Sequence, residues 1–167
     1  MTEQDPALRI KAATAETPTA ALEDIAKSAG TSVAAVLRAL PEGEAYCISG
    51  AHFVTVMDDF RDWGDMTFIV NTGDVILEAK GVVKGAMGSG MYNLSGKAVG
   101  GHLKAEACDM IAFVSRKLFG METHSIQFYN AEGGCMFKIY LGRTADRQLV
   151  PEQVTKYHDL RAGFDTI

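Results

Sequence analysis

Apolar residues in the first third of the chain recur every three or four positions, which is the period of an α-helix. One helix is predicted over residues 19–29 and ends at Gly30, which suits the position after a helix. A second is predicted over residues 31–40 and is stopped by Pro41. A third stripe has the same spacing, ends at Gly64 and consists of Phe53, Val56, Met57, Phe60 and Trp63.

After Gly64 the pattern changes to short runs rich in β-branched and aromatic residues, which predict strands. Asn71-Thr-Gly73 is typical of a tight turn, and residues 131–134 of a hairpin loop. Pro151 opens a closing helix, because proline is suited to a first helical turn. The predicted strands cover residues 66–70, 75–79, 91–94, 102–105, 110–116, 125–130 and 135–141.

Helices, then strands, then one helix indicate an α+β fold with a large antiparallel sheet. The length of 167 residues is that of one ordinary domain. We expect a flexible lead-in over residues 1–18 and a single domain over residues 19–167. Within that domain we expect a helical part, a sheet and a closing helix, at 19–64, 65–148 and 149–162.

The charge and the cysteines narrow the classes of function. Lys and Arg number 16 against 21 Asp and Glu, so the formal net charge is −5, and an acidic domain is a poor general binder of nucleic acid. No apolar run approaches the roughly 18 residues that span a bilayer, and the start resembles no secretory signal. Cys47, Cys108 and Cys135 are odd in number and widely spaced, which favours reduced thiols. We therefore expect a cytoplasmic protein without membrane insertion.

Residues 79–105, the glycine-rich segment, differ from ordinary scaffold. They contain four lysines, no acidic residue and seven of the 17 glycines. Glycine allows close approach of the backbone to a flat ligand, and ammonium groups attract carboxylates. His102 offers a nitrogen ligand and Tyr92 a phenolate, so a mobile site for haem with its two propionates is one interpretation. The other is a solvated face in which both side chains are satisfied within the fold.

Several motifs, in a fixed order, resemble the HutX/ChuX family of bacterial haem-utilisation carrier proteins. The resemblance covers roughly residues 20–162. Its motifs are Asp62–Met66, Asn71–Glu78, Gly90–Lys97, Gly101–Cys108, Gly133–Gly142, Arg147–Leu149 and Glu152–Val154.

This resemblance implies an α+β fold like that of the HemS/ChuS haem proteins, with two chains pairing as a homodimer. It also implies a cytoplasmic haem carrier without chemistry of its own. The cargo would be haem, delivered to a haem-degrading enzyme.

The resemblance also points to residues of the site. His102 falls on a proposed haem histidine, and Tyr92 falls where some members carry a tyrosine suspected of ligating iron. Asn71 and Ala98 stand where family motifs have histidines, so the resemblance does not imply ligation by two histidines of one chain. Tyr92 and His102 are therefore the candidate iron ligands. The other candidate haem contacts are Lys97, Lys104 and Arg143 for the propionates and Met91 for apolar contact.

Three alternatives remain at this point. A haem-degrading enzyme is one, by analogy with related haem proteins. The second is a helix-turn-helix DNA-binding module over residues 22–40, although Ala34 and Ala35 at the would-be recognition positions read no bases. The third is a dimer that binds another flat anion.

Overall fold

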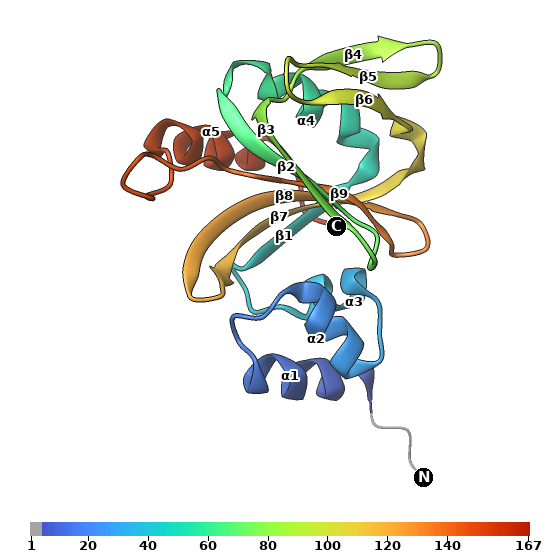
Figure 1. Ribbon diagram of the computed structural model, residues 1–167. Coiled ribbons are helices and arrows are strands. Elements are labelled where there is room, and N and C mark those ends of the chain that lie inside the picture. The colour runs from blue at the N-terminus through green and yellow to red at the C-terminus, as the bar shows by residue number, and fades with distance from the viewer. Residues whose placement is uncertain (1–4) are drawn as a thin grey trace.

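The N-terminal helices form one layer of the molecule. The structure, a computed structural model, describes residues 5–167. Helices α1 (Pro6–Glu16), α2 (Leu22–Ala29) and α3 (Val33–Ala39) lie together beside the sheet (Figure 1). Helix α1 corrects the predicted flexible lead-in. The Asp5 carboxylate accepts a hydrogen bond from the Ala7 amide, and the buried Ile10 and Ala13 anchor the helix.

A six-stranded antiparallel sheet is the centre of the fold. Its order is β1-β7-β8-β9-β2-β3. The strands are β1 (Ala45–Ser49), β2 (Asp65–Asn71), β3 (Ile76–Val82), β7 (Cys108–Leu118), β8 (Met121–Asn130) and β9 (Cys135–Tyr140). Strand β1 lies within the part predicted to be helical and pairs with β7, which is a second correction.

The glycine-rich segment folds into a small antiparallel sheet of β4 (Gly85–Gly88), β5 (Met91–Ser95) and β6 (Gly100–Leu103). The strands predicted over residues 91–94 and 102–105 appear as β5 and β6, and β4 joins them within the segment whose composition predicted a mobile region. Glycine is required at Gly85, because a Cβ there would lie 2.2 Å from the backbone oxygen of Asn93.

Two cores hold the layers together. The larger lies between the six-stranded sheet, the small sheet, α4 (Phe53–Asp59) and α5 (Pro151–Ala162), and includes Phe53, Phe113, Phe128 and Phe137. The smaller lies between α1–α3 and the opposite sheet face. Short 3₁₀ turns, η1 (Gly50–His52), η2 (Phe60–Asp62) and η3 (Ala105–Ala107), connect these elements.

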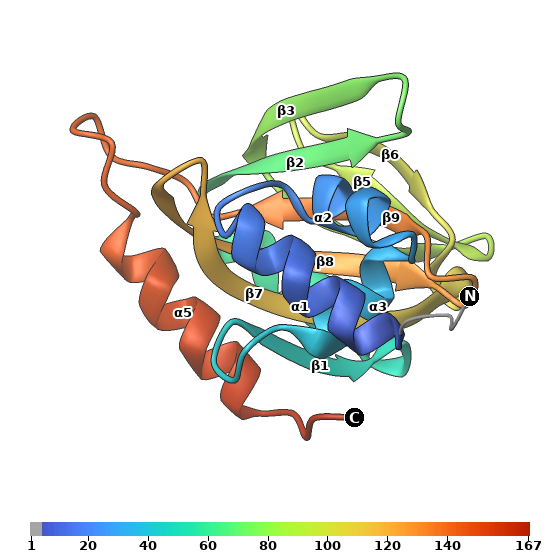
Figure 2. The same ribbon diagram turned by 90° about the horizontal axis from the view of Figure 1, so that it is seen from below.

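The three N-terminal helices cover only part of their sheet face. Figure 2 shows them over β1, β7 and β8, while β3 and much of β2 extend beyond them. The predicted antiparallel sheet, N-terminal helices and C-terminal helix are confirmed. Within residues 5–167, no helix is long and apolar enough to cross a membrane.

Candidate functional site on the small sheet

The two candidate iron ligands lie on neighbouring strands but on opposite faces of the small sheet. In the antiparallel register, Tyr92 is opposite Leu103 and Asn93 is opposite His102. Successive side chains of a strand point to opposite faces, so His102 shares the face of Asn93 and not that of Tyr92. The structure therefore does not bring Tyr92 and His102 together within one chain.

Tyr92 belongs to the core. Its side chain is fully buried, its ring packs edge-on against Phe53 with centroids 5.8 Å apart, and its hydroxyl donates to Asp58 Oδ1 at 2.8 Å. Burial raises the pKa of Tyr92, and the hydrogen bond and charge of Asp58 raise it further. This phenol is thus protonated and satisfied, as the alternative interpretation of the segment expected.

His102 is exposed, and Asn93 determines which of its nitrogens is available. Its Nδ1 lies 2.6 Å from Asn93 Oδ1. The Asn93 amide nitrogen donates to the backbone oxygens of Gly88 at 2.9 Å and Met91 at 3.3 Å, so its Oδ1 must accept. In the neutral imidazole His102 Nδ1 therefore carries the proton, and Nε2 has the lone pair that can bind a metal.

Small, exposed residues surround this imidazole. Ala86, Gly88 and Gly100 share the face of Asn93 and His102, and all three are exposed. Met91, a candidate haem contact, is half-buried on this face. We call these residues with Asn93 and His102 the platform. Lys97, between β5 and β6, and Lys104, directly after β6, are also exposed.

Arg143 is separated from the platform. It follows β9, and its guanidinium donates to the backbone oxygens of Arg147 and Glu122. It lines a hollow over the six-stranded sheet together with Lys80 and Arg147. The predicted set of haem contacts is therefore divided between two regions.

A second hollow lies beside the first and includes Asn71, the position that departs from the family pattern. Sequence reasoning missed Lys138 and Tyr140, which line these hollows. The sequence pattern could have identified them, because they are polar residues two positions apart in β9 and alternate with the buried Phe137 and Ile139. Such alternation places both side chains on one face of the sheet.

The structure does not support the helix-turn-helix alternative. Helix α3 buries Ala34, Val36 and Leu37, and its exposed positions include only one cation, Arg38. A recognition helix needs several polar side chains that reach base edges.

Comparison with known proteins identifies the family. The model for haem utilisation ChuX/HutX matches residues 46–160. The chain belongs to this family. It is 38% identical over 125 residues to the intracellular heme transport protein HutX of Vibrio cholerae, a match that covers 73% of this chain and 65% of that protein.

Solved structures agree with the fold. The heme binding protein ChuX is 40% identical, with a TM-score of 0.83, and the match covers 95% of this chain and 98% of that chain. The heme degrading enzyme ChuS of Escherichia coli O157:H7 has a TM-score of 0.75 at 13% identity. That match covers 95% of this chain and 48% of ChuS, and it shows a shared fold only. The predicted family and ChuX/ChuS-like fold are confirmed.

Proposed function

We propose that this protein binds haem reversibly in the cytoplasm and transfers it, without chemistry of its own. Family membership and the names of the relatives from V. cholerae and of ChuX support this role. The observation that carries the proposal is the exposed imidazole of His102, whose Nε2 is left free by the bond between Nδ1 and Asn93.

The platform would hold haem by three kinds of contact. His102 Nε2 supplies one axial bond to iron. Contact of the porphyrin with Met91 and the flat backbone of Gly88 and Gly100 buries apolar surface, worth about 25 cal/mol per Å². Lys97 and Lys104 attract the propionates. One axial bond on an open face also allows release, which a carrier requires.

Tyr92 would bind iron only after a rearrangement. Its hydroxyl must leave Asp58 and its ring must leave the contact with Phe53. Moving a fully buried aromatic side chain into solvent sacrifices a large apolar contact area. We therefore assign the primary ligand to His102.

A titration of the protein with hemin, followed by the Soret band, tests this assignment. The wild type and Tyr92→Phe are expected to give the same shifted band. His102→Ala is expected to lose most of the shift, and His52→Ala is the matched histidine control. An unshifted wild-type band rejects haem binding. A shift that is lost in Tyr92→Phe but kept in His102→Ala rejects His102 as the iron ligand.

The proposal extends to a homodimer that delivers haem to a degrading enzyme. One copy of this chain matches 48% of ChuS, so two copies have the size of one such molecule. The outer edge of β3 pairs with no strand of the described chain, and Leu77 on it is 65% exposed. Free edges with apolar side chains favour association.

Light scattering after gel filtration tests the pairing. We expect the mass of a dimer for the wild type and of a monomer for Leu77→Lys. A monomeric wild type contradicts this part of the proposal and leaves haem binding untouched. Delivery is tested separately, by transfer of haem from the loaded protein to a haem-degrading enzyme.

A further inference from the structure

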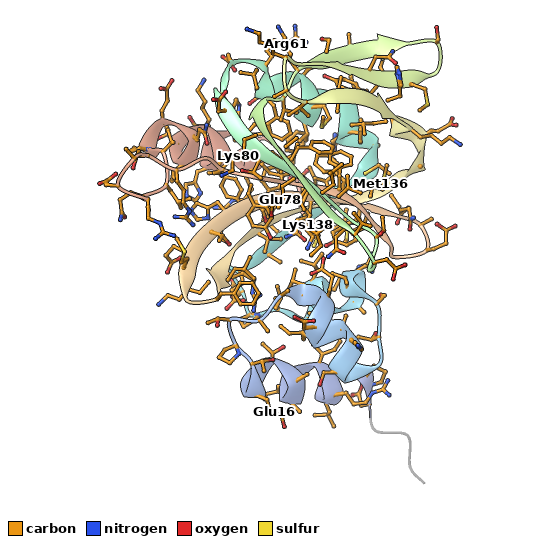
Figure 3. The ribbon with its side chains drawn as sticks, in the orientation of Figure 1. Glu16, Arg61, Glu78, Lys80, Met136 and Lys138 are labelled. Carbon is orange, nitrogen blue, oxygen red and sulfur yellow. The ribbon has the colours of Figure 1, made fainter. Side chains whose placement is uncertain are left out.

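The outer edge of β6 is a sheet edge that nothing in the described chain occupies. The two sheets end at β1, β3, β4 and β6. The Cys47 oxygen of β1 accepts from the Ile167 amide at 3.0 Å, and the Gly85 oxygen of β4 accepts from Arg61 at 3.1 Å. Figure 3 shows Arg61 at the end of the molecule formed by the small sheet. The proposed homodimer uses β3, so β6 is left without a neighbour.

The backbone of β6 directs its polar groups alternately toward β5 and toward the open side. The Ser95 amide of β5 donates to the Lys84 oxygen at 2.9 Å, on the side of β4. Successive residues of a central antiparallel strand bond to opposite sides, so the residue before Ser95 bonds toward β6, where it is paired with Gly101. The N–H and C=O groups of Gly100 and His102 therefore point away from β5.

These outward groups are free and accessible within residues 5–167. Gly100 and His102 are exposed, and their backbones are joined to no segment other than β5. A Cβ built at Gly101 would meet no atom within 4 Å, and one at Gly100 would meet only the Leu94 oxygen at 3.9 Å. Proteins often block a free edge with proline, lysine or a bulge, but β6 (Gly-Gly-His-Leu) has none of these.

The charge around β6 indicates what kind of segment can pair with it. Lys97 lies before the strand and Lys104 directly after it, and both are exposed. The glycine-rich segment contains four lysines and no acidic residue, and the first acid after β6 is Glu106. In a chain with a net charge of −5, this local positive charge favours a segment with acidic side chains.

We propose that β6 is a docking edge for an extended, acidic segment of a partner protein, which adds a strand to the small sheet. The outward groups of Gly100 and His102 would hold its main chain, and Lys97 and Lys104 would attract its acidic ends. Residues directly opposite in paired strands share a face, so the residue opposite His102 would place its side chain on the platform. A protein that receives haem would thereby reach the ligand. This last link rests on the proposed function, whereas docking rests on the edge alone.

A peptide titration of the ¹⁵N-labelled apo protein tests the proposal without haem. The probe is acetyl-Glu-Thr-Val-Thr-Val-Glu-amide, followed by ¹H–¹⁵N spectra. We expect saturable binding in which the amides of Gly100 and His102 shift most, because they gain hydrogen bonds. The amides of Gly101 and Leu103 already bond to β5 and should shift less. The same peptide with lysine at both ends should bind about fivefold more weakly, because two attractions are lost.

Gly100→Pro and Gly100→Ala form a matched pair of variants. Both add side-chain atoms at an open position, and only proline removes the outward N–H donor. Proline is tolerated on an edge strand where its nitrogen faces solvent. Gly100→Pro should bind the peptide about fivefold more weakly than Gly100→Ala, because a hydrogen bond is lost. Lys97→Gln/Lys104→Gln should also bind about fivefold more weakly, with the exposed Lys117→Gln as its control.

The outcomes separate this proposal from haem binding. The docking edge is overturned if the wild type shows no saturable shift, or if the largest shifts lie on β1 or β3. Equal binding by the two Gly100 variants also overturns it. If Gly100→Pro does not fold by circular dichroism, equal binding by Lys97→Gln/Lys104→Gln and Lys117→Gln overturns it instead. An unshifted Soret band in the hemin titration would reject haem binding and leave the docking edge intact.

Discussion

At the scale of single residues, one amide decides what His102 presents to a ligand. Asn93 makes three hydrogen bonds, two through its amide nitrogen to Gly88 and Met91 and one through its oxygen to His102. The two backbone bonds prevent the amide from reversing. The Asn93 amide, and not the bound ligand, therefore fixes the proton of the neutral imidazole on Nδ1.

Replacing Asn93 is expected to release this control. In the apo protein, Asn93→Ala should give a mixture of His102 tautomers, whereas the wild type should show the Nδ1–H form alone. A hydrogen bond is worth about 1 kcal/mol, so hemin binding should weaken roughly fivefold. Long-range ¹H–¹⁵N spectra measure the tautomer without haem. An unchanged tautomer in the variant would contradict the role of Asn93.

Tyr92 is expected to matter for stability and not for the spectrum of bound haem. Tyr92→Phe removes the hydroxyl that bonds to Asp58 and keeps the ring against Phe53. The free energy of unfolding should fall by about 1.5–3 kcal/mol, as for hydrogen bonds to charged groups. Urea denaturation measures this loss. A variant as stable as the wild type would show that the bond contributes little.

At the scale of elements, an ion pair joins the helical layer to the sheet. Glu23 of α2 pairs with Lys138 of β9, whose side chain is 8% exposed. Burial alone would lower the pKa of Lys138, but the Glu23 carboxylate holds it above its ordinary value. The pair therefore stabilises the fold at neutral pH and is lost as the pH rises through this raised pKa.

Removing one partner of this pair is expected to cost more than removing both. Lys138→Met should lower the free energy of unfolding by about 2 kcal/mol, because Glu23 is left without its cation. The double variant Glu23→Leu/Lys138→Met should recover most of that loss. Urea denaturation of the three proteins measures both effects. A double variant less stable than the single one would contradict the account.

The elements that sequence patterns predicted are those with a strong apolar period. The stripe that starts at Phe53 and the long strands of residues 110–116 and 125–130 appear as α4, β7 and β8. Two strands and one helix were missed. Strand β4, Gly-Ala-Met-Gly, has little strand propensity and depends on pairing with β5. Strand β1 is only five residues long, lies between helices in the chain and is held by pairing with β7. Helix α1 depends on burial of Ile10 and Ala13 against its neighbours.

The site was predicted only in part, for a geometric reason. His102 was found because it is the one histidine in a cationic segment. Whether His102 shares a face with Tyr92 depends on the register of β5 against β6. A shift of one residue would place both side chains on the same face of the small sheet. The two hollows over the six-stranded sheet join the hairpin of β2 and β3 to the hairpin of β8 and β9. These hairpins are far apart in sequence, so local patterns could not reveal the hollows.

At the scale of the whole molecule, α5 is docked on the sheet through aromatic contacts that include a titratable ring. The His124 ring of β8 stacks on Tyr157 of α5 with centroids 4.9 Å apart and meets His158 at 5.5 Å. Burial lowers the pKa of His124 from its ordinary 6.5, and the nearby His158 lowers it further.

Acidification is therefore expected to destabilise the protein through His124. Between pH 6.5 and the lowered pKa of His124, the unfolded chain binds a proton that the folded chain does not. The free energy of unfolding therefore decreases as the pH decreases through this range. His124→Phe should reduce this dependence between about pH 7.5 and pH 5.5, in comparison with the exposed His102→Gln. Urea midpoints at both pH values measure it. Equal slopes in both variants would contradict the assignment.

Resonance Raman spectroscopy of the protein loaded with hemin and then reduced shows directly whether His102 ligates the iron. We expect an iron–imidazole stretching mode in the wild type and in Tyr92→Phe. The mode should be absent from His102→Ala and restored by free imidazole. An iron–imidazole mode that persists in His102→Ala would contradict ligation by His102, as would a hemin-loaded protein whose iron–phenolate mode disappears in Tyr92→Phe.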